Sequence, residues 1–246
     1  MKIIGVIPAR YKSSRFPGKP LAKIIDKPMV IWVCEQASKA LGKENVHVAT
    51  DDERISTVVE KYGFNFIMTS DSHLTGTDRL AEVAQKIEAD IYVNIQGDEP
   101  MINPFDIQSI VKAKKDNPTY IINGMASLLE TEDPHNINIP KVIVNLKNDL
   151  IYMSRSAIPG IKSTKQPNPP DYKKQICIYA FNREELLAFN AQKDKTPLES
   201  FEDIEIIRFL ELGYKIKMVE TEGASLAVDI PSDIQKVEKA ILNGKV

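Results

Sequence analysis

Positively charged side chains gather directly after the first apolar run of the chain, residues 3–7. Five cations follow that run: Arg10, Lys12, Arg15, Lys19 and Lys23. Ser13 and Ser14 add hydroxyl donors, and Gly18 lets a ligand approach the backbone closely. Lys19 can meet the oxygens of a leaving phosphate as a point charge. The segment predicts a polyphosphate-binding loop, and a solvated basic turn stays open as the alternative.

This loop differs from the two common glycine-rich phosphate loops. Gly18 and Lys19 are followed by Pro20, where a Walker A loop carries Ser or Thr, and no earlier glycine has the required spacing. The segment is not a Gly-x-Gly-x-x-Gly dinucleotide motif either. Any phosphates bound here would therefore be held mainly by its cations and hydroxyl groups.

Two acidic side chains stand where a metal could be held by oxygen. Asp98 follows the apolar run 91–95, and Asp229 lies between an apolar stretch and a predicted helix start. Carboxylate oxygens suit Mg²⁺ carried in on a nucleotide phosphate, so Asp98 is the first candidate ligand and Asp229 the second. A turn that caps the next helix stays open for Asp98, and a plain helix cap stays open for Asp229.

A hydroxyl-rich segment, residues 75–79, begins a predicted helix. Hydroxyl groups and backbone N–H groups at a helix start can read the polar edge of a base, and Arg79 can donate hydrogen bonds in a forked geometry. Thr77 can equally be a plain N-cap of that helix.

The composition excludes several classes of protein. The 246 residues carry 32 basic and 34 acidic side chains and a net charge of -2, which argues against a nucleic-acid partner. No apolar run approaches the length of about 18 residues that spans a bilayer, and none at the N-terminus suits a signal peptide. We therefore expect a cytoplasmic protein without membrane insertion.

The cysteines and histidines predict neither a redox pair nor a zinc site. Cys34 and Cys177 are far apart in apolar surroundings, which favours buried free thiols. His47, His73 and His135 lack the spacing of metal ligands. Any metal would be held by oxygen ligands.

Strands and helices alternate over the first half of the chain. Apolar runs predict strands at 3–7, 46–50, 65–68 and 91–95, and periodic patterns predict helices at 28–40, 52–62, 77–87 and 104–115. This alternation predicts an α/β fold, a doubly wound and mostly parallel sheet with helices on both faces. Ligands of such folds bind at the carboxyl ends of the strands.

The pattern changes after residue 119. The second half predicts strands at 120–128, 141–145, 150–154, 175–181 and 215–219, a proline-rich loop at 163–171, and helices at 197–212 and 231–242. We expect two units. Residues 1–119 and 176–246 would form a nucleotide-binding domain, and residues 120–175 an inserted antiparallel subdomain.

Five motifs, in this order, resemble one protein family over nearly the whole chain. They are IPARYKSSRFPGKPL at 7–21, HLTGTDR at 73–79, NIQGDEPMI at 94–102, YMSRSAIP at 152–159 and LESFEDIEIIR at 198–208. The family is that of the 3-deoxy-manno-octulosonate cytidylyltransferases, also called CMP-Kdo synthetases. The resemblance implies a doubly wound nucleotide-binding fold of the nucleotide-diphospho-sugar transferase type, with a smaller inserted dimerisation subdomain, and hence a homodimer.

The resemblance also implies a reaction and its participants. CTP and the 2-keto-3-deoxy sugar acid Kdo would give CMP-Kdo and pyrophosphate, with Mg²⁺ as cofactor, in lipopolysaccharide or capsule synthesis. Catalysis would be mostly positioning and electrostatic stabilisation, with Arg10, Lys19 and Asp98 carrying the chemistry.

The resemblance also implies roles for individual residues of this chain. The nucleotide would be bound by Arg10, Ser13, Ser14, Arg15, Lys19, Thr77 and Arg79. The sugar acid would be bound by Gln96, Arg155, Gln175, Tyr179 and Glu202. Asp98 and Asp229 would hold Mg²⁺. The proton acceptor for the sugar hydroxyl would be Asp98 or a metal-bound group.

The chain departs from the family on the sugar side at two positions. Gln175 stands where the family often has His, and Ile206 where it often has Gln. Such changes could move specificity to another ulosonic acid, for example an amino-substituted Kdo or a nonulosonic acid. A non-catalytic nucleotide-binding regulator is the remaining alternative, and the joint presence of Lys19, Asp98 and Asp229 argues against it.

Overall fold

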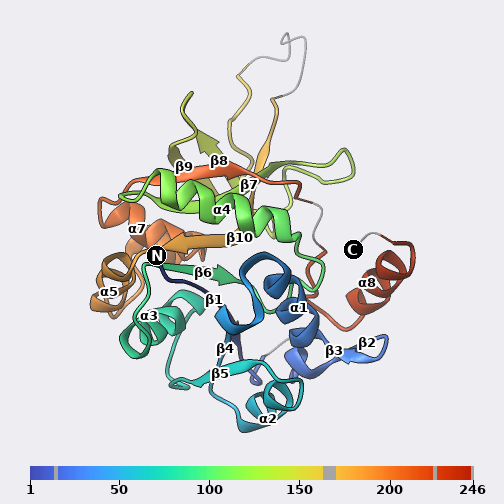
Figure 1. The fold of residues 1–246 in the computed structure, drawn as a ribbon. Helices are drawn as coiled ribbons and strands as arrows, with labels where there is room; N and C mark the ends of the chain where they lie inside the picture. Colours follow the sequence, from blue (N-terminus) through green and yellow to red (C-terminus); the bar gives the residue numbers. More distant parts are fainter. Residues whose placement is uncertain (14–15, 163–169, 224–225, 245–246) are drawn as a thin grey trace.

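A mixed, mostly parallel β-sheet forms the centre of the molecule (Figure 1). The computed structural model describes residues 1–13, 16–162, 170–223 and 226–244. The strands follow the spatial order β11-β7-β10-β6-β1-β4-β5. Their bounds are β1 Ile3–Ala9, β4 Val46–Thr50, β5 Asn65–Met68, β6 Ile91–Ile95, β7 Ile121–Ser127, β10 Lys173–Phe181 and β11 Ile216–Glu220. Within this order only β10 runs antiparallel to its neighbours, so the predicted α/β fold with a mostly parallel sheet is confirmed.

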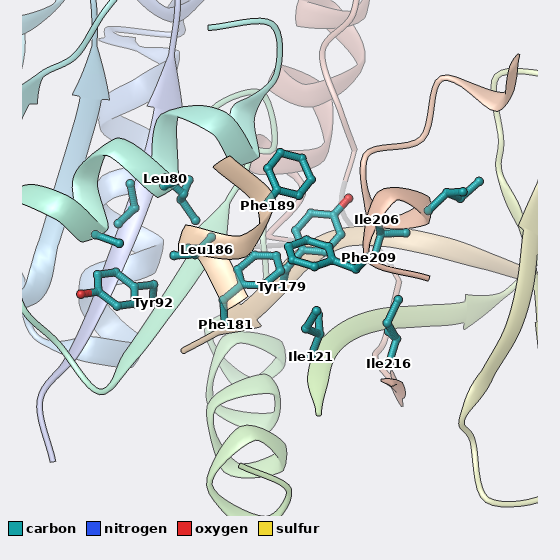
Figure 2. Packing of buried hydrophobic residues seen from close by; sticks show 14 of the residues in the cluster. Leu80, Tyr92, Ile121, Tyr179, Phe181, Leu186, Phe189, Ile206, Phe209 and Ile216 are labelled. Atoms are coloured by element: carbon teal, nitrogen blue, oxygen red, sulfur yellow. The ribbon is translucent and has the colours of Figure 1, made fainter. Parts of the chain in front are cut away.

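Helices cover both faces of the sheet. They are α1 Met29–Leu41, α2 Glu53–Lys61, α3 Gly76–Lys86, α4 Pro104–Asp116, α5 Arg183–Ala191, α6 Pro197–Glu202, α7 Ile206–Glu211 and α8 Asp233–Leu242. Successive strand residues point to opposite faces, so Tyr92 of β6 packs with α3, α5 and α7, while its neighbour Val93 packs with α1, α2 and α4. Figure 2 shows the first of these clusters, with Phe181 and Phe209 stacked at its centre. Within the described ranges, no helix is long and apolar enough to cross a bilayer.

The segment expected as an inserted subdomain divides between the sheet and a hairpin. Its first strand, β7, lies inside the central sheet between β11 and β10. The antiparallel excursion consists of β8 (Lys141–Val144) and β9 (Leu150–Ser154), and β8 pairs with the start of β10. The division into two domains stays a prediction, and residues 163–169 of the expected proline-rich loop lie outside the described residues.

Most predicted elements are confirmed, and one helix is wrong. The strands at 46–50, 65–68, 91–95 and 150–154 match to the residue. The expected single helix 197–212 is two short helices, α6 and α7, because Asp203 between them has a φ of 52°. Arg155 donates a hydrogen bond to the Asp203 carbonyl at 2.9 Å. Helix α5 was not predicted.

Small elements complete the chain. A two-stranded sheet of β2 (Lys23–Ile24) and β3 (Lys27–Pro28) precedes α1, and 3₁₀ turns occur at Lys19–Leu21 and Lys43–Asn45. Helix α8 packs through Val237 against Met29 and Ile24 in a third apolar cluster, which also contains Val228. This cluster fixes the C-terminal segment beside the start of α1.

Arg208 of α7 forms a fully buried ion pair that anchors α6 to α7. Its Nε and Nη2 atoms donate to the two carboxylate oxygens of Glu199 at 2.6 and 2.7 Å. Its guanidinium carbon lies 3.8 Å from the centre of the Phe189 ring. Bidentate geometry and stacking compensate for removing both charges from water.

Removing this guanidinium should destabilise the fold strongly. Arg208→Met leaves the Glu199 carboxylate buried without its partner, so we expect the free energy of unfolding to fall by about 3–5 kcal/mol in urea titrations. The control is Lys112→Ala, which removes an exposed ion pair with Asp116 on α4 and should cost less than about 1 kcal/mol. Equal losses in the two variants would contradict the role given to Arg208.

Candidate active site

A pocket of about 440 Å³, the first pocket, opens at the carboxyl ends of β1 and β6. It is lined by Pro8, Ala9, Arg10, Lys12, Ser13, Lys19, Pro20, Thr75, Gly76, Arg79, Gln96, Gly97, Asp98, Glu205 and Asp229. Gly97 permits its shape, because a Cβ atom there would lie 2.8 Å from the backbone oxygen of Pro8. The pocket therefore lies where the parallel strands predict a ligand.

The cationic loop after β1 forms one wall of the first pocket. Arg10 is exposed, and its Nη1 atom lies 3.5 Å from the Leu74 carbonyl oxygen. Gly18 has a φ of 72° and donates its N–H to the Tyr11 carbonyl at 2.8 Å, which closes the loop. The predicted nucleotide residues Ser14 and Arg15 lie outside the described residues.

Lys19 connects two distant segments of the chain at the edge of this pocket. Its Nζ atom donates to Oδ2 of Asp98 at 2.7 Å and to the Val228 carbonyl at 3.0 Å. The Val228 N–H in turn donates to the Asp98 carbonyl at 2.9 Å. These contacts hold the segment that carries Asp229 against the end of β6, so the two predicted metal ligands line the same pocket.

The alternative interpretation, in which Asp98 and Asp229 serve only as helix caps, finds less support. Helix α4 is capped by Asn103, whose side chain accepts from the Phe105 N–H at 2.9 Å, and not by Asp98. Before α8, the carboxylate of Asp233 accepts the backbone N–H of Asp229 at 3.1 Å.

Asp98 and Asp229 fit a magnesium ion that arrives with a nucleotide. Mg²⁺ in such sites takes one or two carboxylates and completes its octahedron with phosphate oxygens and water. A larger cage of three or more His, Cys, Asp or Glu side chains is not found in the part of the chain that the structure describes. The donor set therefore suits a shared ion better than a resident structural one.

The start of α3 forms the opposite wall. The N-cap is Thr75, not Thr77, and it forms a capping box with Asp78. The Thr77 hydroxyl donates to Oε2 of Glu205 at 2.6 Å. The capping interpretation of Thr77 is therefore wrong by two residues.

Arg79 lines the first pocket with a fully buried side chain. Nη1 donates to the Thr69 hydroxyl, and Nη2 lies 3.5 Å from Oδ1 of Asp51. Nε and Nη2 have no hydrogen-bond acceptor among the described residues. Burial lowers the pKa of Arg79. Buried donors without acceptors beside a pocket indicate a place for a polar ligand or water.

The second pocket, of about 370 Å³, adjoins the first. The two pockets share four lining residues: Gln96, Asp98, Glu205 and Asp229. Gln175 and Tyr179 of β10 line the second pocket, and Nε2 of Gln175 donates to the Tyr179 hydroxyl at 3.1 Å. Burial raises the pKa of Tyr179 well above its ordinary value, so this hydroxyl keeps its proton.

Two further predicted sugar residues hold the wall of the second pocket together. Arg155 lines it, and its guanidinium donates to the carbonyls of Ile137 and Asp203, both at 2.9 Å, and to that of Glu202. Glu202 is not among the lining residues, because its carboxylate accepts from the Ser154 hydroxyl at 2.6 Å and the Arg155 N–H at 2.8 Å. Its contact with a sugar stays a prediction.

Ile206 does not line the second pocket. Its side chain is buried in the apolar cluster with Phe209 of the same helix. The expectation that it faces the sugar is therefore not supported.

Cys34 is buried in the core as predicted, whereas Cys177 is only partly buried and lines the second pocket. Burial raises the pKa of the Cys177 thiol.

Sequence reasoning missed Glu205 and the pair of Lys174 and Glu132. Glu205 lies inside the motif at 198–208. With one helix expected over 197–212, however, nothing in the sequence distinguishes Glu205 from its neighbours as a site residue. Lys174 Nζ contacts Glu132 at 2.6 Å in the second pocket. Only the pairing of β10 with β7 and β8 brings the two residues together, and no local pattern predicts it.

Glu82 anchors the loop between β5 and α3, which borders the first pocket. Its carboxylate accepts from Lys86 at 2.6 Å and from the Ser70 N–H at 2.8 Å, and it lies 2.5 Å from Nε2 of His73. Burial alone would raise the pKa of Glu82, but these hydrogen bonds outweigh it and lower the pKa to about 2.

Three comparisons with known proteins all find similarity to cytidylyltransferases. A model of the family described as "Cytidylyltransferase" matches residues 4–217. The chain is 43% identical to a 3-deoxy-manno-octulosonate cytidylyltransferase of Geobacter metallireducens, covering 96% of both chains. It is 39% identical to one of Escherichia coli, covering 96% of this chain and 94% of that one. A solved structure of CMP:2-keto-3-deoxy-manno-octonic acid synthetase complexed with CTP superposes with a TM-score of 0.91 at 38% identity, covering 99% and 100% of the two chains.

Acid should weaken the loop that Glu82 anchors. A carboxylate with a depressed pKa contributes stability above its unfolded pKa and loses it as the pH falls towards the folded value. We expect Glu82→Gln to lower the free energy of unfolding at pH 7, and this difference to shrink as the pH falls from 4.5 towards 2. Urea titrations of both proteins at several pH values measure it. A difference that stays constant would contradict the assignment.

Proposed function

The chain belongs to the cytidylyltransferase family, and within it to the 3-deoxy-manno-octulosonate cytidylyltransferases, and on this premise we propose how its two pockets act. It is a nucleotidyltransferase that activates Kdo with CTP, giving CMP-Kdo and pyrophosphate. The observation that carries the assignment of the pockets is that they meet at Asp98 and Asp229, beside Lys19. By family inference, the product serves lipopolysaccharide or capsule synthesis in the cytoplasm.

The first pocket takes CTP and the second takes the sugar acid. The cations Arg10, Lys12 and Lys19 lie on the side where a triphosphate would need them. Arg79 lines the same pocket and is the candidate contact to the base or ribose. In the second pocket the hydrogen-bonding groups of Gln175 and Tyr179 suit a polyhydroxylated ligand.

The reaction joins the pockets at their shared residues. The anomeric oxygen of the sugar attacks the α-phosphorus of CTP in line, and the bond from that phosphorus to the bridging oxygen of pyrophosphate breaks. Lys19 neutralises charge that develops on the leaving pyrophosphate, with Arg10 as a second cation. Gln96 lines both pockets and orients the sugar beside the phosphate.

Asp98 and Asp229 would hold the magnesium ion, which when bound supplies charge neutralisation to the phosphates. The proton of the attacking hydroxyl passes to Asp98, a carboxylate that faces both pockets. Glu205 also faces both pockets, but its two oxygens accept three hydrogen bonds from the start of α3. This carboxylate is therefore already engaged in holding the first turn of α3.

A different ulosonic acid is the second candidate substrate. Gln175 lines the second pocket where the family often has His, and it can donate hydrogen bonds only as a neutral group. Ile206 no longer supports this alternative, because it is buried in the core. If Gln175 sets the specificity, the preferred sugar acid would differ from Kdo in the group that contacts this side chain.

Release of pyrophosphate tests the function directly. With CTP and Mg²⁺, we expect turnover with Kdo that exceeds turnover with amino-substituted Kdo and with nonulosonic acids. Higher kcat/KM with another ulosonic acid would overturn the choice of sugar, and no pyrophosphate with any of them would overturn the function.

Asp98→Asn keeps the side chain size and should lower kcat at least about 100-fold. Asp116→Asn, an exposed carboxylate of α4, is the matched control and should keep full activity.

The homodimer expected from the resemblance would use the β8–β9 hairpin. Leu146 and Ile151 expose apolar side chains there. Exposed apolar groups of this kind favour contact with a second copy. We expect a dimer in sedimentation at micromolar concentration and a monomer for Ile151→Asp. Phe105→Asp, a similarly exposed site on α4, should leave the dimer intact. A monomeric unmodified protein would contradict the interface.

A further inference from the structure

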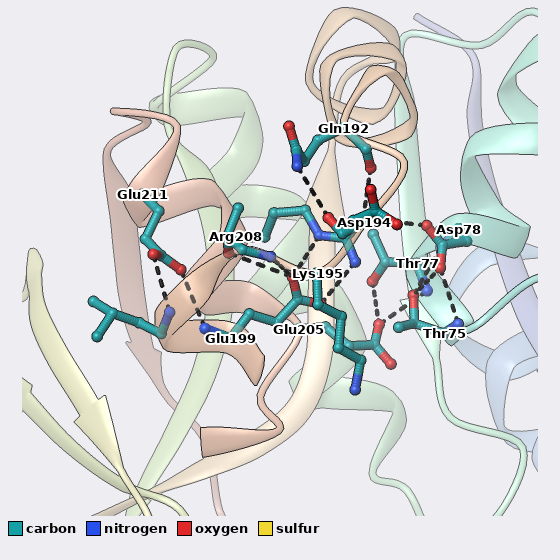
Figure 3. A network of polar contacts seen from close by, with 12 residues as sticks. Thr75, Thr77, Asp78, Gln192, Asp194, Lys195, Glu199, Glu205, Arg208 and Glu211 are labelled. Carbon is teal, nitrogen blue, oxygen red and sulfur yellow. Dashed lines mark hydrogen bonds and ion pairs between the residues drawn. The ribbon is translucent and has the colours of Figure 1, made fainter. Parts of the chain in front are cut away.

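Glu205 joins the two sides of the candidate active site through one carboxylate (Figure 3). It precedes α7, and its oxygens accept three hydrogen bonds from the first turn of α3. Oε1 accepts from the Gly76 N–H at 3.2 Å, and Oε2 accepts from the Thr77 N–H at 2.9 Å and the Thr77 hydroxyl at 2.6 Å. Thr77 and Glu205 lie 128 residues apart in the sequence.

The partners of this carboxylate belong to the first pocket. Thr75, Gly76 and Arg79 line the first pocket, and all three lie at or near the start of α3. The first backbone N–H groups of a helix have no partner within the helix and carry the positive end of its dipole. The Glu205 carboxylate satisfies two of them. The position of this wall of the first pocket therefore depends on Glu205.

The segment that carries Glu205 belongs to the second pocket. Asp203, Ile204 and Glu205 line it in succession. The guanidinium of Arg155, which also lines the second pocket, donates to the Asp203 carbonyl. Any ligand that binds against this wall therefore contacts the chain next to Glu205.

An ion pair also restrains α7 against α3. Nη1 of Arg208 lies 3.4 Å from Oδ1 of Asp78, and Oδ2 of Asp78 accepts from the Thr75 N–H at 2.9 Å. Arg208 and Asp78 do not line the second pocket. They hold α7 near α3, while Glu205 is the side chain that contacts α3 and both pockets.

We propose that Glu205 is a positioning residue that couples the two substrate sites, so that each substrate binds more tightly when the other is present. The inference rests on the proposed function. Ordering residues 203–205 against a sugar also orders the first turn of α3, and the second substrate then meets a wall that is already fixed. Coupling between two sites is reciprocal, so CTP tightens sugar binding by the same factor.

Calorimetry with a non-reacting nucleotide measures this coupling. The probe is α,β-methylene-CTP with Mg²⁺, titrated into the full-length protein with and without saturating Kdo. In the unmodified protein, we expect saturating Kdo to lower the Kd of this nucleotide by at least about 5-fold, and we call this ratio of Kd values the coupling factor. In Glu205→Gln this factor should fall below about 2-fold, because the amide loses the charge and presents a donor towards N–H groups.

Three further variants separate coupling from general damage. Thr77→Val removes the hydroxyl donor to Glu205 and should reduce the coupling factor. Thr77→Ser keeps that hydroxyl and should show the coupling factor of the unmodified protein. Glu211→Gln is the matched control, because Glu211 accepts the Leu198 and Glu199 N–H groups at the start of α6, at 3.0 and 3.1 Å, away from both pockets. It should keep the full factor.

The outcomes distinguish the coupling from the function. An unmodified protein that turns over Kdo but shows no coupling overturns the inference and leaves the function intact. Retained coupling in Glu205→Gln, or equal loss in Glu211→Gln, overturns it as well. If Glu205→Gln does not fold, the contrast between Thr77→Val and Thr77→Ser decides. Absence of turnover with CTP and any ulosonic acid removes the function and the inference together.

Discussion

The contact between Lys19 and Asp98 is the interaction on which the candidate site depends. Lys19 follows a loop with other cations, and Asp98 follows the end of β6 next to Glu99, so each charge is stabilised by a partner of opposite sign. Their pairing at 2.7 Å, together with the Val228 carbonyl on the same ammonium group, draws three separate parts of the chain to one point. The near-zero net charge of the protein thus conceals a local concentration of charge, with Arg10, Lys12 and Lys19 lining the same pocket as Asp98 and Asp229.

The direction of β10 explains why two pockets lie side by side. Parallel strands place their carboxyl ends at one edge of the sheet, whereas an antiparallel strand places its amino end there. β10 is antiparallel to β6, and Ile178 lies opposite Ile95. Gln175 therefore extends past the end of β6, towards Gln96 and Asp98. The reversed strand β10 thus brings the neutral hydrogen-bonding groups of Gln175 and Tyr179 to the edge of the sheet where the parallel strand β1 places the cationic loop.

Sequence patterns predicted the elements whose formation is local. Buried apolar runs such as 91–95 and amphipathic stretches such as 104–115 depend on nearby residues, and the structure agrees with them closely. The break at Asp203 depends on a left-handed backbone conformation whose carbonyl is held by Arg155, 48 residues away, so periodicity alone suggested one long helix. The contacts of Glu205 with α3, and the burial of Ile206, follow from that break. Lys19, Asp98 and Asp229 could be found because a charged side chain that follows an apolar run or precedes a helix start is visible in the sequence itself.

The order of the strands also bears on how a nascent chain must fold. β1, β4, β5 and β6 are complete once residue 95 has been synthesised, and β7 follows soon after. Yet β7 does not pair with β6, because β10 lies between them. The edge of β6 must stay open while β7, the β8–β9 hairpin and the start of β10 emerge from the ribosome. A premature pairing of β6 with β7 would leave β10 without its place in the sheet and would misalign the second pocket.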